Sequence, residues 1–227
     1  MSIFRKRHNR LRTDYLSRAP EGPVHDYLAE PFPALDTPLR ELPMLAVDLE
    51  TTGLDPAVDR IVSIGFIPVD GHSIPIAGGR ELLVRPKTVE GVGHSATVHG
   101  LTDDQVAAGL PLTEALTQTL AALRGRVLLA HHAAIEIRFL SRACQNVFGA
   151  KPLFAAVDTL ALGSDFLMQG DDDIPRGRLR LSALRAQFGL PRYRAHLALT
   201  DALACAELYL ALTAEMGQRT LKQVIVR

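Results

Sequence analysis

The chain has few cysteines and no excess of charge of either sign. Its two cysteines, Cys144 and Cys205, lie in apolar helical patterns without a CxxC pair or a zinc-binding spacing. We therefore expect small core residues in a reducing compartment. The 25 basic residues balance 25 acidic ones, so the formal net charge is zero. This balance excludes affinity that rests on a strongly basic overall field, but it allows a local basic surface that binds nucleic acid.

Long hydrophobic runs are also missing. No apolar run approaches the roughly 20 residues of a membrane-spanning helix. The N-terminus is basic, but no apolar segment follows it as in a secretory signal. We therefore expect a cytoplasmic protein that does not associate with a membrane.

The first 43 of the 227 residues differ in composition from the rest. They contain an early basic cluster and then a proline-rich stretch; the residues are Arg5, Lys6, Arg7, Arg10, Arg12 and Arg18, and Pro20, Pro23, Pro31, Pro33, Pro38 and Pro43. Residues 10–16 favour a short amphipathic helix, and the prolines limit helix formation after it. We expect residues 44–227 to form one domain. Residues 1–43 are then an extension that lies on this domain, binds a protein partner or is a solvated tail.

The apolar pattern predicts three strands followed by strand–helix alternation. The predicted strands are 44–50, 61–69, a segment closing near 82–84, 127–130 and a short strand at Val157. The predicted helices are 112–123, 133–148, 159–167, 181–188 and 198–215. Residues 86–100 and 169–180 are expected to be loops. The first three strands form an antiparallel meander, and the alternation after them indicates an α/β fold with helices packed on a mixed sheet.

Two acids lie at the end of the first strand, in the stretch LAVDLETTGLDP that begins at Leu45. Asp48 and Glu50 are two residues apart, so both carboxylates project from the same face of the strand. Two like charges repel each other and are costly to remove from water. A divalent cation such as Mg²⁺ or Mn²⁺ resolves both problems. The alternative is a strand end that exposes two acids to water.

Further along the chain, acids occur near the starts of two predicted helices. Glu136 is on the flank of an apolar stripe, facing the end of the sheet or, alternatively, lying on the surface where the helix dipole favours acids. Asp201 lies one turn into the last long helix, and His196 precedes that helix. Taken alone, this pair is also explained as a helix-start Asp beside a loop His.

In this order along the chain, the motifs resemble the DEDDh family of 3′–5′ exonucleases. These motifs are Asp48-x-Glu50-Thr-Thr-Gly, His-x-Ala-x-x-Glu136-x-x-Phe-Leu and His196-Leu-Ala-Leu-Thr-Asp201. The family includes the proofreading epsilon subunit of bacterial DNA polymerase III, and the resemblance covers roughly residues 44–212. It implies a ribonuclease-H-like fold, in which a mixed five-stranded sheet with one antiparallel strand carries helices on both faces.

The resemblance also implies roles for individual residues. Asp48, Glu50 and Asp201 would hold a first metal ion, while Asp48 and Glu136 would serve a second. His196 would be the general base that accepts a proton from the attacking water. The residues expected to contact the terminal nucleotide are Thr51, Thr52, Gly53, Leu54 and His99. Asp158-Thr159 is a further, weaker family signature.

This chain departs from the family pattern at two positions. Glu136 replaces the usual Asp, and His132 replaces the usual Asn, which puts the geometry of the second metal in doubt. The expected activity is release of nucleoside monophosphates from 3′ ends of single-stranded DNA. The alternatives are an exoribonuclease, a catalytically silent binding protein and a polymerase-bound subunit. Several arginines flank the His196 segment and either assist substrate binding or are solvated loop and helix charges; they are Arg176, Arg178, Arg180, Arg185, Arg192 and Arg194.

Overall fold

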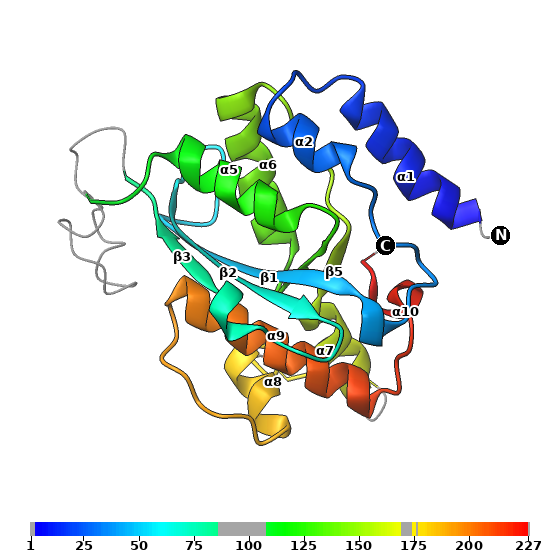
Figure 1. Ribbon diagram of the computed structural model, residues 1–227. Coiled ribbons are helices and arrows are strands. Elements are labelled where there is room, and N and C mark those ends of the chain that lie inside the picture. The colour runs from blue at the N-terminus through cyan, green and yellow to red at the C-terminus, as the bar shows by residue number, and fades with distance from the viewer. Residues whose placement is uncertain (1–2, 86–107, 169–173, 176, 227) are drawn as a thin grey trace.

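A five-stranded mixed sheet forms the centre of the computed structural model, which describes residues 3–85, 108–168, 174–175 and 177–226 (Figure 1). The strands are β1 (Pro43–Thr51), β2 (Ile61–Asp70), β3 (Arg80–Leu83), β4 (Val127–Ala130) and β5 (Ala156–Asp158). Their order in the sheet is β3-β2-β1-β4-β5. Strand β2 is antiparallel to β1 and β3, whereas β4 runs parallel to β1 and β5. The predicted mixed sheet with one antiparallel strand is confirmed.

Helices cover both faces of this sheet (Figure 1). One face carries α1 (Ile3–Leu16), α2 (Pro23–Ala29), α5 (Leu112–Leu123) and α6 (Ala134–Phe148). The other carries α7 (Thr159–Met168), α8 (Leu181–Gln187) and α9 (Ala198–Glu215). Three short helical turns are η1 (Leu39–Glu41), η2 (Ile76–Gly78) and α10 (Leu221–Val224). Within the described residues, no helix has both the length and the apolar character needed to cross a membrane.

Strand β1 lies in the middle of the sheet, which explains its apolar sequence. Residues 44–47 are at most 1% exposed, and all of β4 is fully buried. Strands covered on both faces are expected to be apolar throughout. From residue 44 onwards, the predicted helix and strand bounds agree with the structure to within about two residues. The helix predicted at residues 10–16 is longer than expected, because α1 begins at Ile3. Most of the two predicted loops, 86–100 and 169–180, falls outside the described residues.

Part of the N-terminal segment packs on the rest of the chain. Helix α2 begins at Pro23, a position that tolerates proline because the first N–H groups of a helix have no partner within it. The prolines therefore do not limit helix formation here. Val24, Tyr27 and Leu28 are at most 1% exposed, and the Tyr27 hydroxyl donates a 3.0 Å hydrogen bond to the Leu153 carbonyl.

The segment before β1 also pairs with the C-terminal part of the chain. The Leu39 N–H donates to the Arg219 carbonyl at 2.9 Å, and the Lys222 N–H donates to the Leu35 carbonyl at 2.8 Å. Further on, the Val226 N–H donates to the Ala156 carbonyl of β5 at 2.9 Å. Residues from both ends of the chain thus lie beside this edge of the sheet.

Candidate active site

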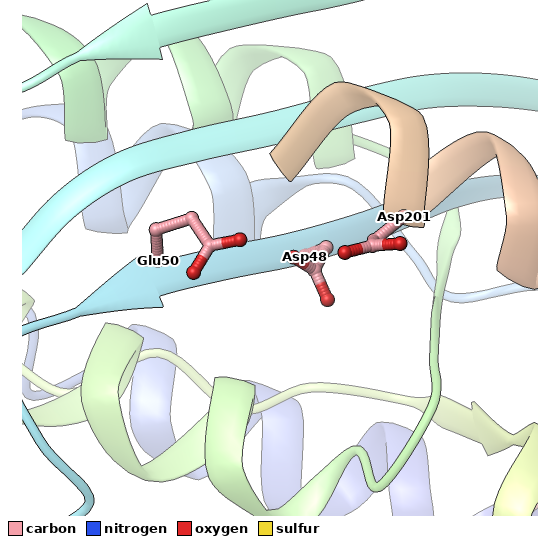
Figure 2. Close-up of side chains that lie close together, drawn as sticks. All are labelled: Asp48, Glu50 and Asp201. Carbon is pink, nitrogen blue, oxygen red and sulfur yellow. The ribbon is translucent and has the colours of Figure 1, made fainter. Parts of the chain in front are cut away.

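Three carboxylates meet where the end of β1 faces the start of α9. Figure 2 shows Asp48 and Glu50 projecting from the strand and Asp201 approaching from the helix. One ligand oxygen from each lies within 4.8 Å of the others. The two strand residues project together, as the alternating pleat predicts. Three acids this close form a set of hard oxygen donors suited to Mg²⁺ or Mn²⁺.

Gly65 allows α9 to come close enough to β1 to build this cluster. It lies on β2 directly opposite Asp48. A Cβ atom at Gly65 would be 2.0 Å from the Ala198 carbonyl carbon, at the first residue of α9. A side chain there would therefore push away the turn that carries Asp201. The role of Gly65 was not predicted, although a glycine inside an apolar strand is a known signal of close backbone approach.

The cluster is electrostatically costly without a cation. Removal from water raises the pKa of Asp48 well above its ordinary value, and the charges of Glu136, Asp201 and Glu50 raise it further. Burial likewise raises the pKa of Glu50 from 4.5 to about 7, although the nearby His196 opposes the shift. Burial also raises the pKa of Asp201, against the hydrogen bond from the His196 backbone. A bound cation would favour the ionised form of all three carboxylates.

Glu136 is buried beside the cluster and is not a surface acid. It lies in the first turn of α6 and is 5% exposed, so the surface alternative is wrong. Its charge is the largest charged contribution to the raised pKa of Asp48. Its Oε2 atom has no hydrogen-bond partner among the described residues. Burial raises the pKa of Glu136 from 4.5 to about 8. A buried oxygen without a partner is costly, and a bound cation or a water on that cation would satisfy it.

Asp158 fixes the start of α6 and so the position of Glu136. Its carboxylate accepts hydrogen bonds from the backbone N–H groups of His132, Ala133 and Leu160 at 2.8, 3.1 and 2.9 Å. The first two bonds hold the residues just before α6, and the third caps the first turn of α7. His132 adopts a left-handed backbone with φ of 74° and has an exposed side chain. Although His132 replaces the usual Asn of the family pattern, its contact with Asp158 is made by its backbone N–H and not by its imidazole.

His196 lies directly before α9, on the exposed side of the cluster. Its backbone is left-handed, with φ of 65°, and its N–H donates a 2.8 Å hydrogen bond to Asp201 Oδ2. The His196 charge lowers the pKa values of Glu50 and Asp201 against the upward effect of burial. The histidine predicted as general base is therefore near two of the three clustered acids.

The turn after β1 is built by its own polar side chains. The Thr51 hydroxyl donates to the Gly53 carbonyl at 2.6 Å, and the Thr52 hydroxyl donates to Asp59 at 3.0 Å. A Cβ atom on Gly53 would lie 2.5 Å from the Asp59 carboxylate, so a side chain there would displace Asp59 from its bonds to Thr52 and the Asp55 N–H. The turn presents Leu54, which is 72% exposed. Substrate contact by these residues stays a prediction, and His99 lies outside the described residues.

One of the six arginines expected to assist substrate binding points into the protein. Arg185 is 4% exposed, and its guanidinium bonds Glu207 and two backbone carbonyls. Its assignment as a substrate contact is therefore wrong. Arg192 and Arg194 are exposed, whereas Arg176 lies outside the described residues. A signal was available, because Glu207 is an isolated acid in an apolar part of α9 and such an acid needs a partner.

Comparisons with known proteins agree with this site. The RNase T family model, described as an exonuclease, matches residues 45–209. The chain is 31% identical over 175 residues to the DNA polymerase III subunit epsilon of Treponema pallidum, covering 77% of this chain and 78% of that protein. It is also 30% identical over 178 residues to the PolC-type DNA polymerase III of Thermotoga maritima. That match covers 77% of this chain but only 12% of the polymerase.

Solved structures share the fold at lower sequence identity. The nuclease domain of 3′hExo, a DEDDh family member bound to rAMP, superimposes with a TM-score of 0.67 at 20% identity, covering 82% of this chain and 96% of that one. Escherichia coli exonuclease I in complex with a dT13 oligonucleotide also gives 0.67, at 16% identity, covering 78% of this chain and 42% of that one. The chain therefore belongs to the exonuclease family, and its motifs resemble those of the DEDDh group of 3′–5′ exonucleases.

Proposed function

We propose that the protein is a divalent-metal-dependent exonuclease that removes nucleoside monophosphates from the 3′ end of single-stranded DNA. The observation that carries this proposal is the cluster of Asp48, Glu50 and Asp201, with ligand oxygens within 4.8 Å. The preference for DNA is supported by sequence relatives named as DNA polymerase III proteins at 30–31% identity.

The residues present fit two divalent ions. Asp48, Glu50 and Asp201 would hold one ion, and Asp48 with Glu136 would serve the other. The unpaired Glu136 Oε2 and the raised pKa of Asp48 support this assignment. When bound, paired ions supply a water of lowered pKa and stabilise charge on the attacking and leaving oxygens.

The chain's own groups supply the remaining steps. The His196 imidazole would accept a proton from the attacking water, the role of a general base. Its backbone bond to Asp201 keeps it beside the acids. Leu54, exposed on the turn after β1, would contact the terminal base or sugar. The exposed Arg192 and Arg194 would contribute salt-dependent contacts to phosphates.

A second candidate is trimming of RNA 3′ ends. It is favoured by the likeness to 3′hExo, whose structure holds rAMP and of which this chain covers 96%. Discrimination would act on the 2′-hydroxyl of the terminal sugar.

The test uses single-stranded DNA and RNA of the same sequence, each labelled at the 5′ end or at the 3′ end. We expect a ladder from the 5′-labelled DNA and immediate release of a labelled mononucleotide from the 3′-labelled DNA. Both should require Mg²⁺ or Mn²⁺ and stop with a chelator. Faster loss of RNA would support the exoribonuclease, and binding without cleavage would identify a silent binding protein.

A further inference from the structure

The segment that carries His196 is anchored by three side chains that the proposed chemistry does not use. Arg185 projects from α8, Glu207 from α9 and Tyr193 from the segment itself, residues 189–197, which joins these helices. We call these three residues the clamp. Arg185 Nη2 bonds Glu207 Oε2 at 2.7 Å, and the Tyr193 hydroxyl donates to Glu207 Oε1 at 2.8 Å. The Arg185 guanidinium carbon lies 4.7 Å from the centre of the Tyr193 ring.

The clamp also bonds the backbone of both the segment and α9. Arg185 Nη2 donates to the Pro191 carbonyl at 2.8 Å, within the segment, and Nη1 donates to the Ala204 carbonyl of α9 at 2.6 Å. Asp201, which belongs to the metal cluster, is one turn before Ala204 on the same helix. Thus the buried Arg185 guanidinium connects the segment with the helix that carries Asp201.

The segment needs such external support. Residues 191–196 are exposed, so little apolar burial fixes them. His196 has a left-handed backbone with φ of 65°, which is strained for a residue with a Cβ atom. At the C-terminal end of the segment, the His196 N–H donates a hydrogen bond to Asp201 at 2.8 Å. The clamp fixes the middle of the same segment through Pro191 and Tyr193.

We propose that Arg185, Glu207 and Tyr193 are positioning residues that hold His196 in register with Asp201, so that its imidazole faces the attacking water. This inference rests on the proposed function, because it assigns the clamp to the general base of that reaction. None of the three residues touches substrate in this role. Their effect is transmitted through the position of the segment.

The test uses variants that keep side-chain size. Arg185 is 4% exposed, and its replacement threatens folding, so the informative changes are Glu207→Gln and Tyr193→Phe. Tyr15→Phe is the matched control for the tyrosine, because Tyr15 is 38% exposed and Tyr193 is 37% exposed. Glu215→Gln controls for loss of an acid on α9, since Glu215 is exposed at the end of that helix.

We expect Glu207→Gln and Tyr193→Phe to lower kcat on single-stranded DNA by on the order of ten- to a hundredfold, as misplacement of a reacting group does. Mn²⁺ binding should change little, and any rise in KM through Arg192 and Arg194 on the same segment should be smaller than the fall in kcat. In a His196→Asn background, neither change should lower kcat further, because the residue they position is gone. Amide hydrogen exchange at residues 192–196 should be faster in both variants. The two controls should match wild type.

Two results would overturn the proposal. An unchanged kcat in both variants would show that the clamp does not position the base. The same fractional loss with and without His196 would show that the clamp acts on the fold rather than through His196. If wild-type protein degraded no nucleic acid, the proposed function would fail separately. Exchange at residues 192–196 would then still decide whether the clamp holds the segment, and unaltered exchange would reject it.

Discussion

The end of β1 and residues 189–197 supply the two chemical parts of the site, but they are held in different ways. Asp48 and Glu50 belong to a strand paired on both sides, with its neighbours at residues 44–47 fully buried. His196 belongs to an exposed segment that accepts a hydrogen bond from Arg185 and donates hydrogen bonds to Glu207 and Asp201. The metal-binding part is therefore fixed by the backbone of the sheet, and the base by side-chain contacts.

This difference implies that the two parts fail independently. A change in the segment should lower the rate of the chemical step and leave metal binding intact. A change at the junction of β1, β2 and α9 should remove metal binding as well. The following predictions test that separation, beginning with the largest expected effect.

Replacement of His196 should lower kcat by about 10²–10⁴-fold, the usual contribution of a general base. His196→Asn is the cleanest change, because Asn tolerates the left-handed backbone that His196 adopts but does not accept a proton near neutral pH. Mn²⁺ binding should be retained. Single-turnover rates from about pH 6 to pH 9 give the measurement. A near-normal rate across this range would show that another group is the base.

Gly65→Ala should weaken the metal-binding cluster at the junction of β1, β2 and α9. The new methyl would meet the Ala198 backbone at 2.0 Å and displace the start of α9. We expect activity to fall by on the order of a hundredfold and Mn²⁺ affinity to fall with it. Overpacking of this kind also destabilises by about 1–3 kcal/mol. Thermal unfolding and Mn²⁺ titration test both effects. Normal metal affinity in a folded Gly65→Ala protein would contradict the role of this close approach.

The smallest expected effect is a pH-dependent change in stability. Glu50 and Glu136 have folded-state pKa values of about 7 and 8, above their ordinary value of 4.5. The folded protein therefore retains protons that the unfolded chain has released, and metal-free stability should fall as the pH rises from about 5 to 8. Mg²⁺ should raise the melting temperature more at the upper end of this range.

Melting curves with Mg²⁺ or chelator, for wild type and Glu136→Gln, provide the check. The variant should show a weaker dependence on pH, since one of the acids with a raised pKa is removed. A metal-free melting temperature that is constant over this range and insensitive to Mg²⁺ would contradict the account of a strained acidic cluster.

The sequence was sufficient for the parts of the molecule that follow local periodicity. The run 44–47 and the alternation of Asp48 and Glu50 predict a buried strand that ends in two acids, as the structure shows. Helix α5 and strand β4 also have the predicted bounds, 112–123 and 127–130. In each case the signal lies within the element itself.

Contacts between distant segments were harder to predict. Arg185 was expected to bind substrate, because nothing in residues 181–188 reveals that its partners lie on α9 and in the 189–197 segment. Helix α2 was missed since its starting proline was interpreted only as a helix breaker. The burial of Glu136 was left open because a first-turn acid has the same local pattern whether it faces solvent or the sheet.

The most direct test of the central claim is Mn²⁺ binding by electron paramagnetic resonance in wild type, Asp48→Asn, Asp201→Asn and the control Glu215→Gln. The central claim is that β1 and α9 together form a divalent metal site from Asp48, Glu50 and Asp201. We predict that wild type and Glu215→Gln bind Mn²⁺ with equal affinity, and that both Asn variants lose this binding while remaining folded. Wild-type affinity in folded Asp48→Asn or Asp201→Asn would contradict the claim.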